Sequence, residues 1–554
     1  MKPWIKQYPS WLPHEIEVSE RNALEMFERS VQRVPDSPAL HYFDRTLTYA
    51  QVDELATGFA AGLIDRGMNP GDRVGMFLQN VPQALVTVVG TWKAGGTVVP
   101  LNPMLKEREL RYHLGDSGAR FIVCLESLYP IVQEAITGLD FKLAISTSEL
   151  DFLDEANLPA MLKGVSRVGC PGAVDMMELV GSCRGRKVER PRLGPDDNAF
   201  LTYTSGTTGP SKGATNTHGN VVFNSHLYQT WMRLGEGDVI AGLAPVFHIT
   251  GLIGHFTAAM VAGIPVILFY RFDAGEALAQ IERWKGTFTV AAITAYISLL
   301  DHPDIGKRDI SSLAKAYSGG APVSPAMVER FQAATGTYIH NIYGLTETTS
   351  PSHATPLGGQ APVDNDTGAL SVGVPVCNTT VRIVDPESGQ DLPPGSIGEV
   401  VTKGPMVVPG YWQKPEESAH AIRDGWLFTG DVGKMDDDGW FYIVDRTKDM
   451  IIASGYKVWP REVEDVLYQH PAVREASVIG VPDEYRGETV KAFVSLRAGQ
   501  ESSVSSEELV QFCRDRMAAY KYPRAVEIID EVPKTLTGKF LRRELRQRRT
   551  SPST

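Results

Sequence analysis

Cysteine is scarce in this sequence, and its placement excludes two kinds of site. The 554 residues include only five cysteines, which lie far apart and show no Cys-x-x-Cys spacing. Neither a disulfide framework nor a zinc site is indicated, and a reducing compartment fits such a composition. We therefore expect a cytoplasmic protein.

Basic residues are fewer than acidic ones. Lysine and arginine number 54 against 66 aspartate and glutamate residues, which gives a formal net charge of -12. Proteins that bind the nucleic-acid backbone rely on clustered lysine and arginine. The composition therefore argues against a general nucleic-acid-binding protein.

Long uninterrupted apolar runs are missing as well. The N-terminal residues 1–7 lack the apolar core of a secretion signal, and residues 551–554 are not a peroxisomal address. The most apolar run, 251–270, contains a histidine, glycines and Pro265, so we expect a buried helix followed by a strand rather than a membrane span. Contact with a membrane surface and the oligomeric state, a homodimer included, stay open.

What the sequence does contain is a loop between Tyr203 and Gly213 that is rich in glycine and hydroxyl side chains. Glycine lets a backbone turn tightly and expose its N–H groups to a ligand, while Lys212 adds a cation. The loop is not a Walker motif, in which lysine directly follows the second glycine. Its chemistry suits a polyphosphate, and the alternative is an ordinary surface loop. The residues expected to bind phosphates are Thr204, Ser205, Gly206, Thr207, Thr208, Gly209 and Lys212.

Strand-like and helical patterns alternate in the first hundred residues. We expect a helix over 50–66, a strand over 73–77, a helix over 82–93 and a strand over 97–100. This order is typical of parallel α/β layering. Residues 140–192 show little periodicity and receive no assignment.

Several ordered motifs then carry a resemblance. The phosphate loop, the Tyr-Gly-x-Thr-Glu segment ending at Glu347, the Thr-Gly-Asp ending at Asp431 and the Pro-Lys-Thr-x-Thr-Gly-Lys ending at Lys539 are all present. Together they resemble the adenylate-forming acyl-CoA synthetases, and the region 445–543 most resembles bacterial medium- and long-chain fatty acyl-CoA ligases. One departure is Pro210, which stands one place earlier than usual, with Ser211 between it and the lysine.

The resemblance implies roles for the nucleotide-binding residues. Tyr343 and Gly344 would bind the nucleotide, the tyrosine by offering a stacking face to adenine. Thr346 would reach the α-phosphate, and Glu347 with Thr204 would hold Mg²⁺, which prefers hard oxygen ligands. The adenine-side turn would consist of Gly319, Gly320 and Ala321. Asp431 would accept hydrogen bonds from the ribose, since a carboxylate can accept from two hydroxyls.

The remaining roles fall on the acyl side and on the hinge. The segment around His248 resembles the family's acyl-carboxylate site, and Arg446 would contact ribose or phosphate. Lys448 would absorb the backbone rotation of a hinge that Gly455 follows, and both would contribute to cofactor binding. Lys539 would carry the adenylation step, because a flexible ammonium on a glycine-flanked loop can follow the charge that develops during phosphoryl transfer. The residues expected to act in catalysis are Lys539, Glu347, Thr346, Arg446 and His248.

The implied fold is of the α/β and α+β classes. Residues 1–444 would form a large layered α/β domain for acyl and ATP binding, 445–449 a hinge, and 450–554 a small mobile α+β lid that carries the catalytic lysine. The Gly410-Tyr411-Trp412 match is interpreted as part of the scaffold.

The implied activity is an acid–thiol ligase that uses ATP, Mg²⁺ and CoA. It would convert a fatty acid to acyl-AMP with release of pyrophosphate, and then transfer the acyl group to CoA. An aryl-CoA ligase is the main alternative, because the acyl pocket sets chain length and the motifs do not define that pocket. Leu252 stands where some long-chain relatives have a gating tryptophan, and the family's usual Pro-Thr is missing near residues 292–296. A peptide-synthetase domain is disfavoured, since that group has aspartate in place of His248. A luciferase-like oxygenase and an inactive nucleotide-binding scaffold remain further alternatives, the latter disfavoured by the intact motifs.

Overall fold

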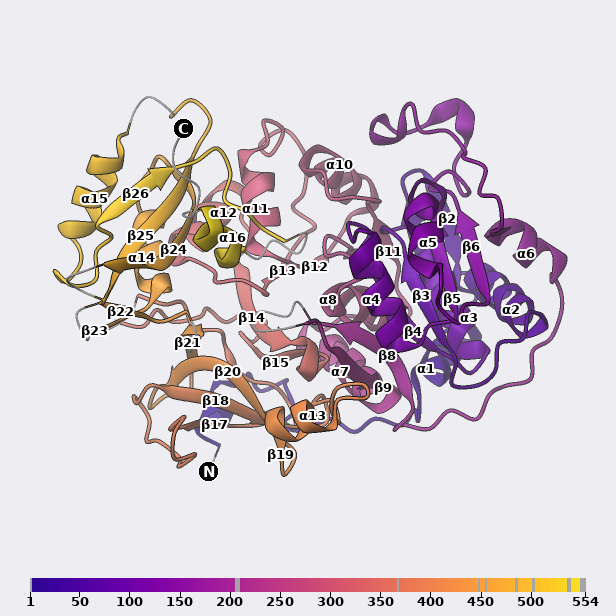
Figure 1. Ribbon diagram of the computed structural model, residues 1–554, viewed down its shortest axis with the longest axis horizontal. Helices are drawn as coiled ribbons and strands as arrows, with labels where there is room; N and C mark the ends of the chain where they lie inside the picture. Colours follow the sequence, from indigo (N-terminus) through magenta and orange to yellow (C-terminus); the bar gives the residue numbers. More distant parts are fainter. Residues whose placement is uncertain are drawn as a thin grey trace.

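The strands and helices nearest the N-terminus form a mostly parallel sheet in the computed structural model (Figure 1). The structure describes residues 2–204, 210–365, 368–446, 449–453, 456–483, 487–500, 504–535 and 540–548. In spatial order the strands of this first sheet are β7 (Val174–Asp175), β6 (Leu143–Thr147), β5 (Phe121–Leu125), β3 (Arg73–Phe77), β4 (Thr97–Pro100), β8 (Asn198–Tyr203) and β9 (Gly213–Thr217). They run parallel except for β9, which pairs antiparallel with β8. The predicted parallel layering is confirmed.

Helices cover both faces of this sheet because successive strand side chains point to opposite sides. Phe121 and Val123 share a core with residues of α2 and α3, whereas Ile122 and Cys124 pack with residues of α4 and α5. The helices are α2 (Tyr49–Asp65), α3 (Pro82–Lys93), α4 (Glu107–Ser117), α5 (Tyr129–Ile136) and α6 (Met176–Ser182). The unassigned residues 140–192 supply β6, β7 and α6 at one edge.

The second sheet lies at the centre of the molecule (Figure 1). In spatial order its strands are β16 (Val374–Pro375), β15 (Ser350–Ala354), β14 (Ile339–Leu345), β13 (Lys315–Ser318), β12 (Phe288–Ala291), β10 (Ile240–Ala241), β11 (Val266–Leu268), β1 (Pro38–Tyr42) and β2 (Arg45–Thr48). Because β13 and β14 are parallel neighbours, their carboxyl ends bring the predicted turns at 319–321 and 343–347 to one edge. Its helices are α1 (Ala23–Arg33), α10 (Ala274–Trp284), α11 (Ile293–Asp301) and α12 (Pro325–Thr335).

Helix α7 (His218–Trp231) connects the two sheets. The Thr217 side chain accepts from the backbone of Asn220, whose side chain accepts from Thr217 in return, so a capping box starts the helix. Phe223, Leu227 and Trp231 are 3%, 1% and 0% exposed. The core stripe expected from their spacing is confirmed.

The apolar run 251–270 is buried, but its helix is not uniform. It begins as α8 (Ile249–Gly251), continues as the π-helix η5 (Leu252–Thr257) and ends as α9 (Ala258–Ala262), before β11. A π-helix is rare and occurs often at functional sites. The sequence pattern predicted the burial but not this widened turn.

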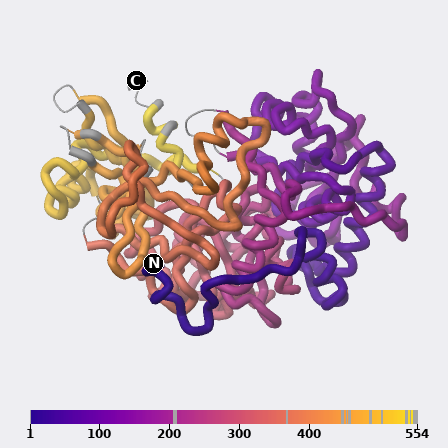
Figure 2. The backbone as a smooth tube through the Cα atoms, turned by 90° about the horizontal axis from the view of Figure 1, so that it is seen from below, coloured from indigo at the N-terminus to yellow at the C-terminus, as the bar shows by residue number. Residues whose placement is uncertain are grey.

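An antiparallel sheet packs beneath the central one (Figure 1). It consists of β17 (Thr380–Val384), β18 (Gly398–Lys403), β20 (Trp426–Met435), β19 (Ile422–Arg423) and β21 (Phe441–Arg446). The short helix α13 (Pro415–Ala421) lies beside it. Figure 2 shows the N-terminal segment extended along the body beside this region. The Tyr8 hydroxyl donates to the Pro375 carbonyl at 2.6 Å, and the Ile16 N–H to the Asn378 side chain at 2.8 Å, so the segment is fastened along its length.

The C-terminal residues form a smaller α+β domain at one end of the molecule (Figure 1). Its sheet contains β23 (Tyr456–Val458), β22 (Ile451–Ala453), β25 (Gly487–Leu496), β24 (Val473–Asp483) and β26 (Ala525–Ile528), and its helices are α14 (Pro460–Tyr468), α15 (Ser506–Arg514) and α16 (Arg542–Arg548). A core of its own supports this domain. The predicted fold class, a large N-terminal domain with a small C-terminal one, is confirmed. The residue boundaries 444/445 and 449/450 stay predictions.

Candidate active site

Two predicted phosphate-binding residues face each other at the base of the β8–β9 hairpin. The Thr204 N–H donates to the Lys212 carbonyl at 3.0 Å, directly beyond the register pair Tyr203–Gly213. Residues 205–209, which include the other predicted phosphate contacts, lie outside the described residues. The hairpin therefore fixes both ends of the loop.

Helix α4 anchors this hairpin from the side. The Tyr112 hydroxyl donates to the Ser211 carbonyl at 2.8 Å, and the Tyr203 hydroxyl donates to Asp116 at 2.8 Å. Asp116 also forms an ion pair with Lys414 at 3.2 Å. Ser211, the residue that departs from the usual loop pattern, thus supplies a carbonyl that holds the loop beside Lys212.

The Tyr-Gly-x-Thr-Glu motif forms a tight turn between β14 and β15. Glu347 lies on the short helix η6 (Thr346–Thr348). A Cβ at Gly344 would lie 1.8 Å from the Ser350 carbonyl oxygen, so only glycine fits there. Thr349 and Ser350 adopt φ angles of 50° and 94°, which are sparsely populated by residues other than glycine.

Two buried asparagines, which the sequence analysis did not single out, hold this turn. Asn216 on β9 donates through Nδ2 to the Thr346 carbonyl and to the Thr349 hydroxyl, each at 3.0 Å. Asn224 on α7 donates to the Thr348 carbonyl at 2.9 Å. Asparagine is depleted in strands and is seldom fully buried, so Asn216 within β9 was a signal that could have been used.

Tyr411 joins the hairpin to the turn. Its hydroxyl donates to Glu347 Oε1 at 2.7 Å, and Lys212 Nζ lies over its ring, 4.9 Å from the centroid. Burial, reinforced by the Glu347 charge, raises the pKa of Tyr411 well above its ordinary value. The hydroxyl therefore stays protonated and donates. A cation, a carboxylate and a hydroxyl are thus brought together from three distant segments of the chain.

The donor set around Glu347 is compatible with Mg²⁺. Throughout the part of the chain that the structure describes, no group of three or more histidine, cysteine, aspartate or glutamate side chains could hold a metal. Mg²⁺ usually keeps several waters and binds through one or two carboxylates together with substrate phosphates. The Glu347 carboxylate is partly exposed and has lone pairs beyond the one used by Tyr411. A single carboxylate beside a phosphate loop therefore fits this ion.

The predicted adenine and ribose residues also lie together. The Tyr343 hydroxyl donates to Asp431 Oδ2 at 2.7 Å. Asp431 lies on β20, directly opposite the Arg446 backbone on β21. The structure thus brings Tyr343, Asp431 and the Arg446 backbone to one place, although the Arg446 side chain is outside the described part.

The proposed adenine-side turn follows β13, next to the strand that carries Tyr343. A Cβ at Gly319 would lie 2.5 Å from the Ile342 carbonyl oxygen, and Gly320 has a φ of 79°. Both positions therefore require glycine. Ala321 comes directly after them, at the same edge of the sheet.

His248 lies at the start of α8, where its Nδ1 accepts from the Thr250 N–H at 3.4 Å. The π-helix that follows packs against α7, since a Cβ at Gly254 would lie 3.0 Å from the Tyr228 hydroxyl. That hydroxyl is in turn 2.9 Å from the Ser350 hydroxyl. Tyr228 therefore connects the segment that carries His248 with the Glu347 turn.

The predicted C-terminal site residues Lys448, Gly455 and Lys539 lie outside the described residues. The flanks of the Lys539 segment are described. Lys534 and Phe540 form a backbone bridge, and Lys534 forms an ion pair with Glu475 at 2.5 Å. Arg542 donates to both oxygens of Glu464, at 2.8 and 3.0 Å. Both ends of this segment are therefore fastened to the C-terminal domain.

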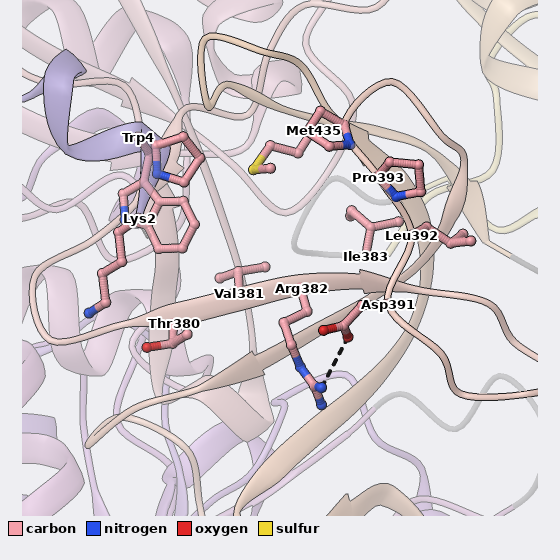
Figure 3. A pocket seen from close by; sticks show the side chains of 12 residues that line it. Lys2, Trp4, Thr380, Val381, Arg382, Ile383, Asp391, Leu392, Pro393 and Met435 are labelled. Carbon is pink, nitrogen blue, oxygen red and sulfur yellow. Dashed lines mark hydrogen bonds and ion pairs between the residues drawn. The ribbon is translucent and has the colours of Figure 1, made fainter.

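A separate hollow lies between the N-terminal segment and β17 (Figure 3). It has a volume of about 330 Å³ and is lined by Trp4, Arg382 and Met435, among others. Arg382 and Asp391 form an ion pair at 3.0 Å on its wall. None of the predicted site residues contributes to its lining. It belongs to the scaffold that fastens the N-terminus.

Over the residues that the structure describes, none of the helices combines the length and the apolar character needed to cross a bilayer.

Comparison with known proteins points to one family. The AMP-binding enzyme family model matches residues 27–412, and the model of the AMP-binding enzyme C-terminal domain matches 462–539. A long-chain-fatty-acid–CoA ligase of Bacillus subtilis (strain 168) is 39% identical over 558 residues, which cover 99% of this chain and 98% of the relative.

Solved structures agree. The anthranilate CoA ligase AuaEII in complex with anthranoyl-AMP superposes with a TM-score of 0.87 at 28% identity, covering 97% of this chain and 98% of that one. ATP-bound MatB from Rhodopseudomonas palustris gives 0.82 at 28% identity, with 95% and 99% covered. The predicted family and enzyme class, an AMP-forming acid–CoA ligase, are confirmed. The chain belongs to the AMP-binding enzyme family.

Proposed function

We propose that this protein is an ATP-dependent long-chain fatty acid–CoA ligase, which forms acyl-AMP and then acyl-CoA. The observation that supports the proposal most directly is that Lys212 and Glu347 both contact the side chain of Tyr411. A phosphate loop and a carboxylate that contact the same side chain suit a nucleoside triphosphate with its metal ion.

The first half-reaction brings a fatty-acid carboxylate against the α-phosphate of ATP. Because both are anions, the site must offset their repulsion and stabilise the charge that passes to pyrophosphate. Lys212, Lys539 and the backbone N–H groups of the loop are the cation and dipole sources that we assign to this task. Mg²⁺, held by Glu347 and Thr204, would supply further charge neutralisation on the phosphates.

The nucleotide would be oriented by the cluster at the ends of β13, β14 and β20. Tyr343 would stack on adenine beside the Gly319–Gly320–Ala321 turn, and Thr346 would contact the α-phosphate. Asp431 already accepts from Tyr343 through one oxygen. A carboxylate can accept from more than one hydroxyl, so Asp431 would also accept from the ribose, which Arg446 would approach from the neighbouring strand.

The second half-reaction requires no enzyme nucleophile. The CoA thiol would attack the acyl carbonyl, a C–S bond would form, and the bond to the AMP oxygen would break. The cysteines fit this assignment, since burial raises the pKa of Cys377 and Cys513 to about 12 and disfavours their thiolates. Rotation about Lys448 would bring the C-terminal domain, with Gly455, into position for CoA.

The acyl group is the least constrained part of the proposal. The identity to a long-chain-fatty-acid–CoA ligase supports a fatty acid. The superposition on an anthranilate CoA ligase favours an aryl acid as the second candidate. Leu252, which stands where some long-chain relatives have a gating tryptophan, is fully buried. A cytoplasmic location stays a prediction.

Pyrophosphate release from ATP and Mg²⁺ across a panel of acids tests the assignment. The panel would include acetate, dodecanoate, palmitate, benzoate and phenylalanine, each with and without CoA. We expect the highest rate with dodecanoate or palmitate, together with CoA-dependent thioester formation. A maximum at benzoate would establish the aryl alternative. Pyrophosphate release without any thioester would show that the acyl group goes to a different acceptor.

A further inference from the structure

Tyr411 belongs to a Gly-Tyr-Trp segment whose sequence match suggested only a scaffold role. In the structure its side chain lies between two groups of the proposed nucleotide site. The hydroxyl contacts Glu347 at 2.7 Å, and the ring lies beneath the Lys212 ammonium.

The backbone on each side of Tyr411 is fixed. Trp412 N–H donates to the Gly213 carbonyl at 2.8 Å, and Thr215 N–H donates to the Gly410 carbonyl at 3.0 Å, which ties the segment to β9. The Tyr411 N–H itself donates to the Ser418 hydroxyl at 2.8 Å. The ring therefore projects from a rigid support rather than from a surface loop.

The same segment is tied to the Glu347 turn. Val408 N–H donates to the Glu347 carbonyl at 2.9 Å, so the backbones that carry Tyr411 and Glu347 are held next to each other. The hydroxyl then holds Oε1 of the carboxylate. Glu347 is thereby restrained at both its main chain and its side chain.

We propose that Tyr411 is a positioning residue, which orients the Glu347 carboxylate so that its second oxygen faces the metal ion. The inference rests on the proposed function. Among the described residues no cluster of three or more possible metal ligands is present, so the orientation of the Glu347 carboxylate matters more for metal affinity than in a site with several such ligands. Partners that fix a metal ligand typically contribute about 10- to 100-fold to metal affinity.

The chain offers a matched pair of variants. Tyr411→Phe removes only the hydroxyl and keeps the ring face on which Lys212 rests. Tyr112→Phe removes a hydroxyl of the same kind from the other side of the hairpin, where it contacts the Ser211 carbonyl. The second variant measures the effect of a hydroxyl lost from the loop, whereas the bond to Glu347 is lost only in the first.

The test is calorimetric binding of the non-hydrolysable α,β-methylene analogue of ATP to the full chain at a series of Mg²⁺ concentrations. We expect Tyr411→Phe to raise the Mg²⁺ concentration at half-maximal binding about tenfold. Affinity without metal should stay within about twofold of the wild type, since the ring is retained. Tyr112→Phe should leave the Mg²⁺ midpoint unchanged.

A double-mutant cycle with Glu347→Gln completes the experiment. If Tyr411 acts through Glu347, adding Tyr411→Phe to Glu347→Gln shifts the midpoint no further. An additive shift, or a wild-type midpoint for Tyr411→Phe alone, overturns the role of Tyr411. Analogue binding by the wild type that depends on neither Mg²⁺ nor Glu347 would instead contradict the proposed function. A thermal melt verifies that each variant is folded.

Discussion

Replacement of Gly344 by alanine should damage the nucleotide site through the backbone alone. A Cβ at this position would lie 1.8 Å from the Ser350 carbonyl oxygen and 2.9 Å from the Pro351 Cα. An ordinary contact begins at 3.4 Å, so the two strands would have to separate by about 1.6 Å (3.4 − 1.8). No flexible side chain can absorb this displacement, because the atoms it meets belong to the backbone.

The size of the effect follows from the hairpin's pairing. Gly344 pairs with Pro351 and Leu345 with Ser350, so a separation of the strands breaks this register. Overpacking typically costs 1–3 kcal/mol, and we expect about 3 kcal/mol here because the clash is with main chain. The melting temperature of the N-terminal domain should fall by about 5 °C.

The functional loss should exceed the loss of stability. Tyr343 and Glu347 flank Gly344, and a displacement of about 1 Å in a positioning group can cost about 100-fold in rate. We expect pyrophosphate release to fall about 100-fold, with the order of preference among acids unchanged. Scanning calorimetry and the pyrophosphate assay measure the two effects.

Gly181 in α6 provides the matched control. Apart from its chain neighbours and the backbone of its own helix, no atom lies within 4 Å of a Cβ built there. Gly181→Ala should therefore raise the stability by up to about 1 kcal/mol, since it restricts the unfolded chain, and leave activity unchanged. Wild-type stability and activity in Gly344→Ala would refute the argument that backbone contact enforces glycine.

Three further outcomes are expected. Lys448→Pro should impair thioester formation far more than adenylate formation in rapid-quench measurements, whereas equal losses would count against a hinge at this residue. Arg542→Ala removes the bidentate partner of the buried Glu464 carboxylate and should destabilise the C-terminal domain by about 3 kcal/mol. The loss would be measured as faster hydrogen exchange in α14, and an unchanged exchange rate would contradict it. Burial lowers the pKa of His255 to about 4 and of His353 to about 3. The unfolded chain protonates both histidines near pH 6.5, before the folded chain does. The free energy of unfolding should therefore fall by up to about 1.4 kcal/mol per histidine and pH unit as the pH decreases from 6.5 to 4. A melting temperature that is constant from pH 7 to pH 5 would contradict this.

The sequence predicted those elements that local patterns determine. Helix α3 and strands β3 and β4 begin and end at the expected residues, because Pro82 fits the first helical turn and apolar residues fill the strands. Strand β7 was missed because it spans only Val174–Asp175, and so short an edge strand has no periodicity to detect. Strand β6 was missed as well, although it is as long as β3. The π-helix was missed because one widened turn barely alters an apolar pattern.

The contacts within the site were less accessible than its motifs. Glu347 and Lys212 were identified because they stand in recognisable motifs. Tyr411 was assigned to the scaffold, since its contact with Glu347 joins residues 64 positions apart. Asn216 acts in the same way, across 130 positions, on the Thr346 carbonyl. Such roles arise from tertiary pairing, which a single sequence does not record.

The fastening of the Lys539 segment at Lys534 and Arg542 has a kinetic consequence. Since the described residues on both sides of it are attached to the C-terminal domain, we expect this lysine to move with that domain. If it serves the adenylation step, each turnover includes a movement of the domain through solvent. If this movement limits turnover, the turnover rate would fall in proportion to solvent viscosity, and the rate would depend on hydrodynamic drag as well as on the chemical step.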